Sequence, residues 1–266
     1  MTLKELLDKT TLKGMGREIG LDVQMVNGEM VCKALNPNDP RYSTDFILPS
    51  MKMVDACRAD DFEFFQPFID AGKLTAEQMH HAAERYYLGK TKSNQAIFWM
   101  IDDLFEPLDA HIGNDWISKF LIAREPIVEY WHFKRCLFGL HLLSMNLRVR
   151  SSVSSMPISI VEREEAAVVL SELFPESIWM AYATTTHLTL ELFAPLKGCN
   201  VTFYPRTDPS KSNYLFFCDL ADSIRQHDPT IDISVDSLLE DHATEDQKSR
   251  CIDLLEFLLE SIHIIN

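Results

Sequence analysis

The fold class is decided by residues 158–181, which read ISIVEREEAAVVLSELFPESIWMA. A short apolar run opens the stretch, and apolar residues then recur at helical spacing from Ala166 to Leu173. A second short apolar run follows the break at Pro175. Strand, helix and strand in this order are typical of a parallel βαβ unit. We therefore expect an α/β fold here.

The alternation continues toward the end of the chain. Residues 188–196 carry an apolar helical face, and residues 201–204 and 231–235 predict two further strands. A helix is expected between these strands, and a closing helix over residues 245–261. Because no hairpin signal interrupts the series, we predict a mainly parallel four-stranded sheet with covering helices.

Three consecutive regions are predicted along the chain. Residues 1–92 mix helix signals with one hairpin and are expected to form a smaller α+β N-terminal region. Residues 93–155 connect it to residues 156–266, which carry the predicted parallel sheet. With 46% hydrophobic and 10% aromatic residues, the 266-residue chain is able to bury a substantial core.

Local motifs place three elements before the sheet. The Asn-Gly dipeptide at 27–28 lies between two apolar runs and predicts a tight hairpin, because both residues tolerate positive φ. Thr75 and Gln78 form a capping-box pattern, which predicts a helix that runs to about Tyr87 and is terminated by Gly89. The apolar run at 95–101 predicts a buried strand.

Charge and cysteine spacing exclude several classes of site. Forty acidic and 25 basic residues give a net charge of −15, which opposes binding to phosphate backbones and anionic membranes except through a local basic patch. The six cysteines are never closer than nineteen positions, so no zinc ribbon or dithiol motif is present, and we expect reduced, mostly buried thiols. The sequences GxGxxG, GxxxxGK[ST] and GxSxG are absent too.

The cellular location is inferred from the charges at residues 1–10 and from the short length of the apolar runs. Residues 1–10 carry charges where a secretory signal would be apolar, and no apolar run is long enough to span a bilayer. We expect a cytoplasmic protein without a membrane partner.

One basic stretch stands out in the acidic chain. Residues 117–163 hold seven cations against three carboxylates, or 7 − 3 = +4. Four cations are predicted to contact nucleic acid: Lys134, Arg135, Arg148 and Arg150. Trp131 and Phe133 lie close to two of them and are candidates for stacking on unpaired bases. The alternative is a solvated surface of alternating charge.

Polar residues follow three of the predicted parallel strands. Glu162 ends the first, a Thr-rich loop containing His187 follows the second, and Asp208 closes residues 204–208 after the third. Ligands of open α/β sheets bind beyond the carboxyl ends of the strands. Two carboxylates that converge there have the geometry that holds Mg²⁺ for phosphoryl transfer, so Mg²⁺ is the candidate cofactor.

These segments resemble a Toprim-like domain, and in particular an uncharacterised family of bacterial mobile-element proteins related to primases. The resemblance covers roughly residues 85–260. Its strongest parts are residues 160–167, 174–175, 178–181, 196–198 and 201–208.

A Toprim domain places a Glu after its first strand and a D-x-D motif after its third. Glu162 and Asp208 match as catalytic and metal residues, but Arg206 stands where the first Asp belongs. The resemblance therefore implies a degenerate active site. It also implies a catalytically impaired protein that associates with nucleic acid, such as single-stranded DNA, and with replication proteins.

Each of these residues also has a structural interpretation. Glu162 is suited to cap the helix that follows it, Asp208 to form a turn, and Arg206 to pair with Glu162 as a remnant of a lost metal site. A working Mg²⁺-dependent nucleotidyl or phosphoryl transferase would need Asp219 or Asp222 as the missing carboxylate. An acidic protein-interaction scaffold is the third interpretation, favoured by the net charge.

Overall fold

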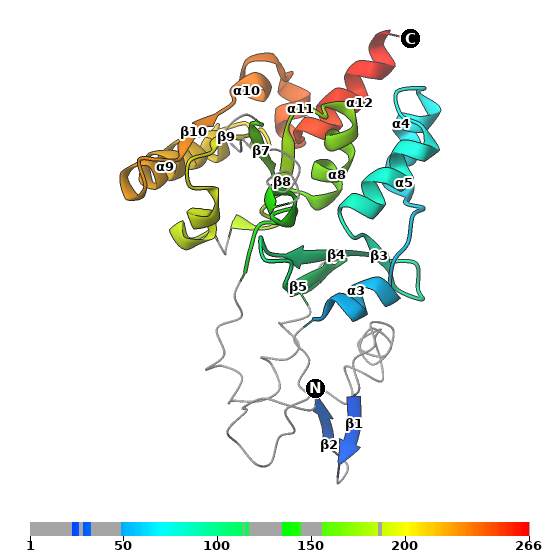
Figure 1. Cartoon of the computed structure of the whole chain (residues 1–266). Helices are drawn as coiled ribbons and strands as arrows, with labels where there is room; N and C mark the ends of the chain where they lie inside the picture. The colour runs from blue at the N-terminus through cyan, green and yellow to red at the C-terminus, as the bar shows by residue number, and fades with distance from the viewer. Residues whose placement is uncertain are drawn as a thin grey trace. The chain divides into compact units, whose positions relative to one another are not determined.

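The computed structural model describes two compact units, and each is described by itself (Figure 1). Unit 1 comprises residues 1–60 and 87–136, and unit 2 comprises residues 61–86 and 137–266. Within them the structure describes residues 23–26, 29–32, 49–113, 115–116, 135–144, 156–185 and 188–265.

Unit 2 is built on the predicted sheet. Its four strands lie in the order β10-β9-β7-β8, and every neighbouring pair is parallel. The strands are β7 (Ile158–Val161), β8 (Ile178–Ala181), β9 (Asn200–Phe203) and β10 (Asp232–Val235). The prediction of a parallel four-stranded sheet is confirmed.

The order of the strands reverses at β7. The chain passes from β7 through α8 (Glu164–Leu173) to β8 on one side, whereas β9, α9 (Ser212–His227) and β10 lie on the other side. Right-handed crossovers in opposite directions put α8 and α9 on opposite faces of the sheet (Figure 1). This topology leaves a switch point between β7 and β9, beyond their carboxyl ends.

Aromatic rings fill the α9 side of the sheet. Phe203 of β9, Phe193 and Phe217 are fully buried. The Phe203 ring lies 5.7 Å from that of Phe193 and 5.0 Å from that of Phe217, measured between centroids. Phe193 belongs to η4 (Leu190–Leu196), a 3₁₀ helix with Pro195 inside it. Since the proline ring would clash in an α-helix with the carbonyl four residues earlier, the predicted helical face at 188–196 forms this tighter turn instead.

The predicted closing helix over 245–261 is wrong as a single element. The chain forms α11 (Glu245–Ser249) and α12 (Leu254–Ile265), preceded by α10 (Leu238–His242). Cys251 lies between them with φ of 54°, in the left-handed region that ends helices. Asp253 and Glu256 each accept a hydrogen bond from the other's backbone N–H, and this begins α12 anew. Among the described residues, no helix is long and apolar enough to cross a membrane.

Unit 2 also contains η1 (Glu63–Phe65), α4 (Gln66–Asp70) and α5 (Ala76–Arg85). The capping box of Thr75 and Gln78 is confirmed, with both hydrogen bonds present. The helix α5 ends at Arg85, close to the predicted end at about Tyr87, but the predicted role of Gly89 is wrong because Gly89 begins the strand β3. Arg85, the last residue of α5, pairs with Glu172 of α8 at 2.9 Å, and this ion pair joins α5 to α8.

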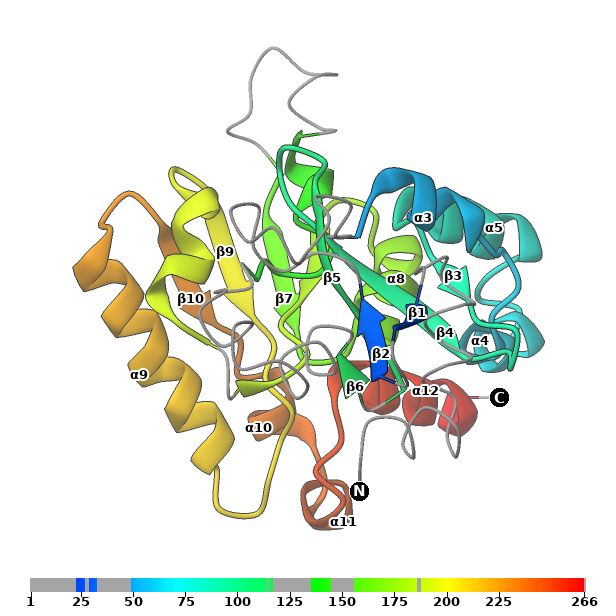
Figure 2. The same ribbon diagram turned by 90° about the horizontal axis from the view of Figure 1, so that it is seen from below.

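Unit 1 contains two antiparallel sheets and the helix α3 (Met51–Ala56) (Figure 2). The predicted hairpin strands are β1 (Val23–Val26) and β2 (Glu29–Cys32), and their pairing is confirmed. The second sheet has the order β3-β4-β5-β6, and its strand β4 is the predicted buried one. Its strands are β3 (Gly89–Lys90), β4 (Ala96–Ile101), β5 (Pro107–Ile112) and β6 (Asp115–Trp116).

The cysteines within the described side chains are free thiols, as predicted. Only Cys57 among them is buried, while Cys136, Cys199, Cys218 and Cys251 are partly exposed. The expectation of mostly buried thiols is therefore wrong. Three of these four belong to α9 or to turns at the ends of helices and strands, where one side of the side chain meets solvent.

Candidate functional site

The candidate site lies at the switch point of the parallel sheet. Glu162 follows the last residue of β7, and residues 204–208 follow the end of β9. The backbone N–H of Tyr204 still donates to Ile160 at 2.8 Å, which holds the beginning of this turn against β7. Adjacent parallel strands thus bring the two segments to one edge of the sheet.

An ion pair joins these two strand ends. Nε of Arg206 lies 3.2 Å from Oε2 of Glu162. The Arg206 side chain is 50% exposed and that of Glu162 is 19% exposed. The predicted approach of Glu162 to the 206–208 turn is confirmed, and it is the cation of that turn that makes the contact. An exposed partner limits the stabilisation by such a pair to about 0–1 kcal/mol.

The environment of Glu162 disfavours an unpaired negative charge. Burial raises the pKa of its carboxyl above the ordinary value, the charge of Arg206 lowers it, and nearby Asp253 raises it again. Burial also raises the pKa of Tyr182, and the charge of Glu162 adds to that effect. The buried Tyr182 hydroxyl has no hydrogen-bond partner in the described part of the chain. Arg206 is therefore the main group that stabilises the Glu162 carboxylate.

Asp208 has a different role from the one its motif suggests. Its carboxylate accepts hydrogen bonds from the backbone N–H groups of Ser210, Ser212 and Asn213, at 2.8, 3.2 and 2.8 Å. The hydroxyls of Ser210 and Ser212 donate to it as well. These donors include the first turn of α9, so the structural interpretation of Asp208 as a turn residue describes its geometry.

The hydrogen bonds to Asp208 control its ionisation. Partial burial opposes the charged form, but the donors from Ser210, Asn213 and Ser212 together outweigh it and lower the pKa to about 2. A group whose pKa is depressed in the folded state stabilises the fold above its unfolded pKa of about 3.9. This stabilisation is lost as the pH falls through about 2.

Asp208→Asn keeps an acceptor oxygen and removes the charge. At pH 7 we expect it to lower the free energy of unfolding by about 1 kcal/mol, a value reduced for contact with solvent. The difference from wild type should shrink as the pH falls from 4 to about 2, because at pH 2 the wild-type carboxyl is protonated in the unfolded state and about half protonated in the folded state. Urea denaturation at pH 7, 4 and 2 measures it. An equal difference at all three values would contradict this account.

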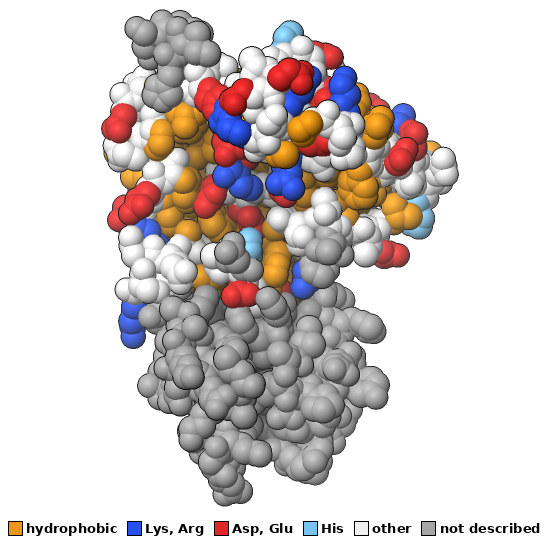
Figure 3. Space-filling model, turned by 180° about the vertical axis from the view of Figure 1, so that it is seen from behind, with side chains coloured by type: hydrophobic (Ala, Val, Ile, Leu, Met, Phe, Trp, Pro, Cys, Tyr) orange, Lys and Arg blue, Asp and Glu red, His pale blue; other side chains and the backbone are white. Residues whose placement is uncertain are grey.

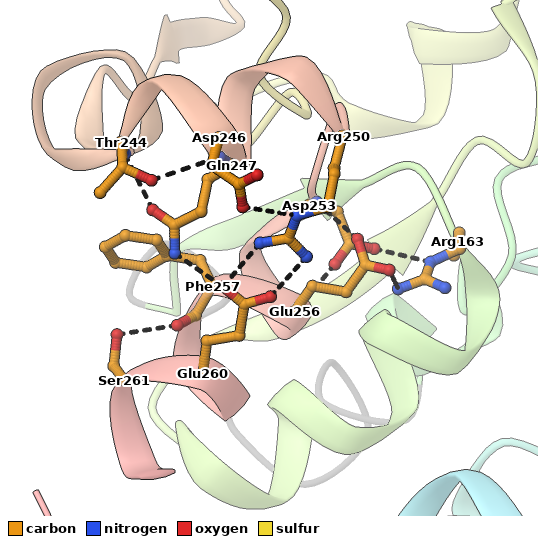
Figure 4. A network of polar contacts seen from close by, with 10 residues as sticks. All are labelled: Arg163, Thr244, Asp246, Gln247, Arg250, Asp253, Glu256, Phe257, Glu260 and Ser261. Atoms are coloured by element: carbon orange, nitrogen blue, oxygen red, sulfur yellow. Dashed lines mark hydrogen bonds and ion pairs between the residues drawn. The ribbon is translucent and has the colours of Figure 1, made fainter. Parts of the chain in front are cut away.

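The turn after β9 is also anchored to the C-terminal helices. The N–H of Thr207 donates to the Ile252 carbonyl at 3.0 Å, and its hydroxyl donates to the buried carboxylate of Glu240 at 3.0 Å. On the β7 side, Arg163 donates to Asp253 at 2.6 Å (Figure 4). Both strand ends are thus fixed by the segment that begins α12.

Figure 4 shows a second part of this polar network. Arg250 contacts both carboxylate oxygens of Glu260 at 2.7 and 3.0 Å, and it also donates to Asp246. Gln247 donates to the same Glu260 carboxylate. These contacts hold α11 against α12, across the break at Cys251.

A pocket adjoins the turn at 206–208 that follows β9. It has a volume of about 200 Å³ and is lined by Thr185, Ser212, Asn213 and Phe216. The Asn213 side-chain amide donates to the carbonyl of Arg206 at 2.9 Å, which connects the pocket to the ion-paired turn. Sequence reasoning missed this pocket. The sequence feature that could have indicated it is the pair Phe216 and Phe217. Two adjacent residues of a helix cannot both face one core, so one of the two rings must point elsewhere.

The predicted metal ligands are Glu162 and Asp208, with Asp219 or Asp222 as the substitute for the missing carboxylate. Among the described residues, no group of three or more His, Cys, Asp or Glu side chains is placed to hold a metal ion. Asp219 and Asp222, the proposed substitutes, lie on α9, where Asp222 pairs with Arg225. His187 lies outside the described residues.

Only one of the predicted nucleic-acid residues is described. The Arg135 guanidinium lies 4.8 Å from the centroid of the Trp116 ring, which also stacks on His111 at 4.8 Å. Burial lowers the pKa of Arg135, and the charge of Asp109 opposes that effect. The other predicted contacts, Lys134, Arg148 and Arg150, lie outside the described residues, as do Trp131 and Phe133.

Comparison with known proteins identifies a family and nothing beyond it. A family model described as Domain of unknown function (DUF6371) matches residues 63–207, which is more than half of the chain. No curated protein and no solved structure matches the sequence.

Proposed function

The chain belongs to the DUF6371 family, a domain of unknown function, and we propose that it is a catalytically impaired Toprim-like protein. In this proposal it is a cytoplasmic, nucleic-acid-associated binding module that serves the replication or transfer of a mobile element. Its partners are single-stranded DNA and replication proteins.

The ion pair between Arg206 and Glu162 is the observation that carries the proposal. A Toprim-like metal site would need carboxylates at this switch point. Here a guanidinium occupies the exit of β9 and lies 3.2 Å from the Glu162 carboxylate, which reverses the local charge. Asp208, which resembles the last Asp of the motif, is already bonded to the turn that begins α9.

Nucleic-acid association is supported by the basic stretch at 117–163. The remainder of the chain sums to −15 − 4 = −19, so phosphate contacts are best placed in this stretch. Among the described side chains on the face shown in Figure 3, Lys and Arg lie among Asp and Glu and form no continuous basic patch. Arg135 and Trp116 combine a cation with an aromatic ring, the chemistry that single strands engage.

Single-stranded DNA should bind with an affinity that falls steeply with salt. The expected slope of log affinity against log salt is about −0.7 for each phosphate neutralised. The double variant Arg148→Ala, Arg150→Ala should make this slope shallower by about 1.4. Fluorescence anisotropy of a labelled oligothymidine at two salt concentrations measures both quantities.

The matched control removes the same charge elsewhere. Lys73→Ala with Lys197→Ala takes two exposed cations from unit 2 and should leave the slope unchanged. Absence of binding at low salt would favour an acidic protein-interaction scaffold instead. Metal-dependent nucleotide transfer by the wild-type chain would identify an active transferase.

A further inference from the structure

The pocket beside the 206–208 turn combines an aromatic ring with hydrogen-bonding groups. Phe216 forms one side of it, and Thr185, Ser212 and Asn213 supply two hydroxyls and an amide. Its volume of about 200 Å³ is below the roughly 300–1,000 Å³ of sites for drug-sized ligands. The space therefore suits one ring system and excludes an extended molecule.

Phe216 is exposed in a way that the core does not explain. The residue is 42% exposed, although Phe217 beside it is fully buried and contacts it edge to face, with 5.2 Å between the ring centroids. Among the described side chains, the exposed large hydrophobic ones are Leu104, Leu215 and Phe216, and two of these are adjacent on α9. Of these three, Phe216 is the one that lines the pocket, where its exposed ring is able to stack on a planar ligand.

Cations suitable for phosphates lie next to the pocket. Lys211 directly precedes the pocket residue Ser212 and is exposed. Arg206 is half exposed, and its carbonyl accepts a hydrogen bond from the pocket residue Asn213. The nearby carboxylate of Asp208 faces backbone N–H groups of its own turn. The segment that leads into the pocket residues of α9 thus supplies two exposed cations for the phosphates of a bound nucleotide.

We propose that this pocket holds one unpaired base of a single-stranded nucleic acid. The base stacks on Phe216, its polar edge bonds to Thr185, Ser212 or Asn213, and its flanking phosphates contact Lys211 and Arg206. This inference rests on the proposed function and adds a base-binding position to it. Every base has a face that stacks on an aromatic ring, so little sequence preference is expected.

The test compares two labelled oligonucleotides of equal length and charge, an oligothymidine and an abasic strand, on the full chain by anisotropy. Wild type should bind the oligothymidine more tightly. Phe216→Ala should weaken that binding by about 5- to 150-fold, the range for one stacked base, and abolish the preference. Leu215→Ala is the matched control, since Leu215 is exposed on the same helix turn and does not line the pocket.

The outcomes separate the inference from the function on which it rests. Equal, salt-dependent binding of both strands, or equal effects of Phe216→Ala and Leu215→Ala, would overturn the base pocket and leave the proposed function standing. If neither strand binds, the proposed function fails. Titration with thymidine monophosphate, followed by the amide shifts of the pocket residues, then tests the base pocket by itself. Amide shifts at Ser212 to Phe216 with this nucleotide, but not with deoxyribose phosphate, would support the pocket, and their absence would refute it.

Discussion

Phe203→Ala is expected to lower the free energy of unfolding by about 3–5 kcal/mol, which would remove much of the stability of an ordinary domain. Phe203 ends β9 and is fully buried between Phe193 and Phe217. Truncation removes the ring from both aromatic contacts and leaves a cavity that the strand cannot close. Because residues 204–208 follow directly, the loss should also disturb the turn that carries Arg206.

Urea denaturation followed by circular dichroism measures this effect. Leu215→Ala is the control, because an exposed side chain should change the free energy of unfolding by no more than about 0.5 kcal/mol. Amide hydrogen exchange in β9 and β10 should accelerate in Phe203→Ala only. A loss below about 1 kcal/mol would mean that β9 is not the central packing element described for unit 2.

The middle of the parallel sheet could be predicted from the sequence because two of its strands, β7 and β8, are buried on both faces. β7 and β8 are buried along their whole length, so each appears as a short continuous apolar run between helical patterns. β5 was not predicted, since it begins at a proline and its burial is interrupted at Leu108 and His111. The break before α12 was missed because the apolar periodicity continues across Cys251, which adopts positive φ without being a glycine.

The candidate site also has one part that could be predicted from the sequence and one part that could not. The approach of Glu162 to the 206–208 turn follows from topology alone, because carboxyl ends of adjacent parallel strands share one edge. The pocket depends on Thr185 and Phe216, which are 31 positions apart, and on the orientation of α9. The direction of the Asp208 carboxylate was also beyond prediction, since both a turn and a metal ligand use the same residue type.

Arg206→Asp is expected to strengthen Mn²⁺ binding by about tenfold or more, equivalent to at least about 1.4 kcal/mol. The substitution replaces a cation beside Glu162 with a carboxylate and so provides two anionic groups at the switch point. Carboxylates with retained waters are the ligands that divalent cations of this type prefer. Titration calorimetry of the wild type and the variant measures the change.

The same substitution should make stability depend on metal. Without Mn²⁺ the variant should melt at a lower temperature than wild type, because the mostly buried Glu162 loses its cation and meets a like charge. Added Mn²⁺ should recover part of that loss, since a ligand that binds only the folded state stabilises it.

Two control variants test whether the gain in Mn²⁺ affinity belongs to the switch point. Arg206→Ala removes the cation without adding a carboxylate and should gain less affinity than Arg206→Asp. Lys73→Asp makes the same change from cation to carboxylate at an exposed position outside the switch point and should gain none. If Arg206→Asp and Lys73→Asp bind Mn²⁺ equally, the switch point is not a degenerate metal site, and the ion pair of Arg206 with Glu162 serves only to join β7 and β9.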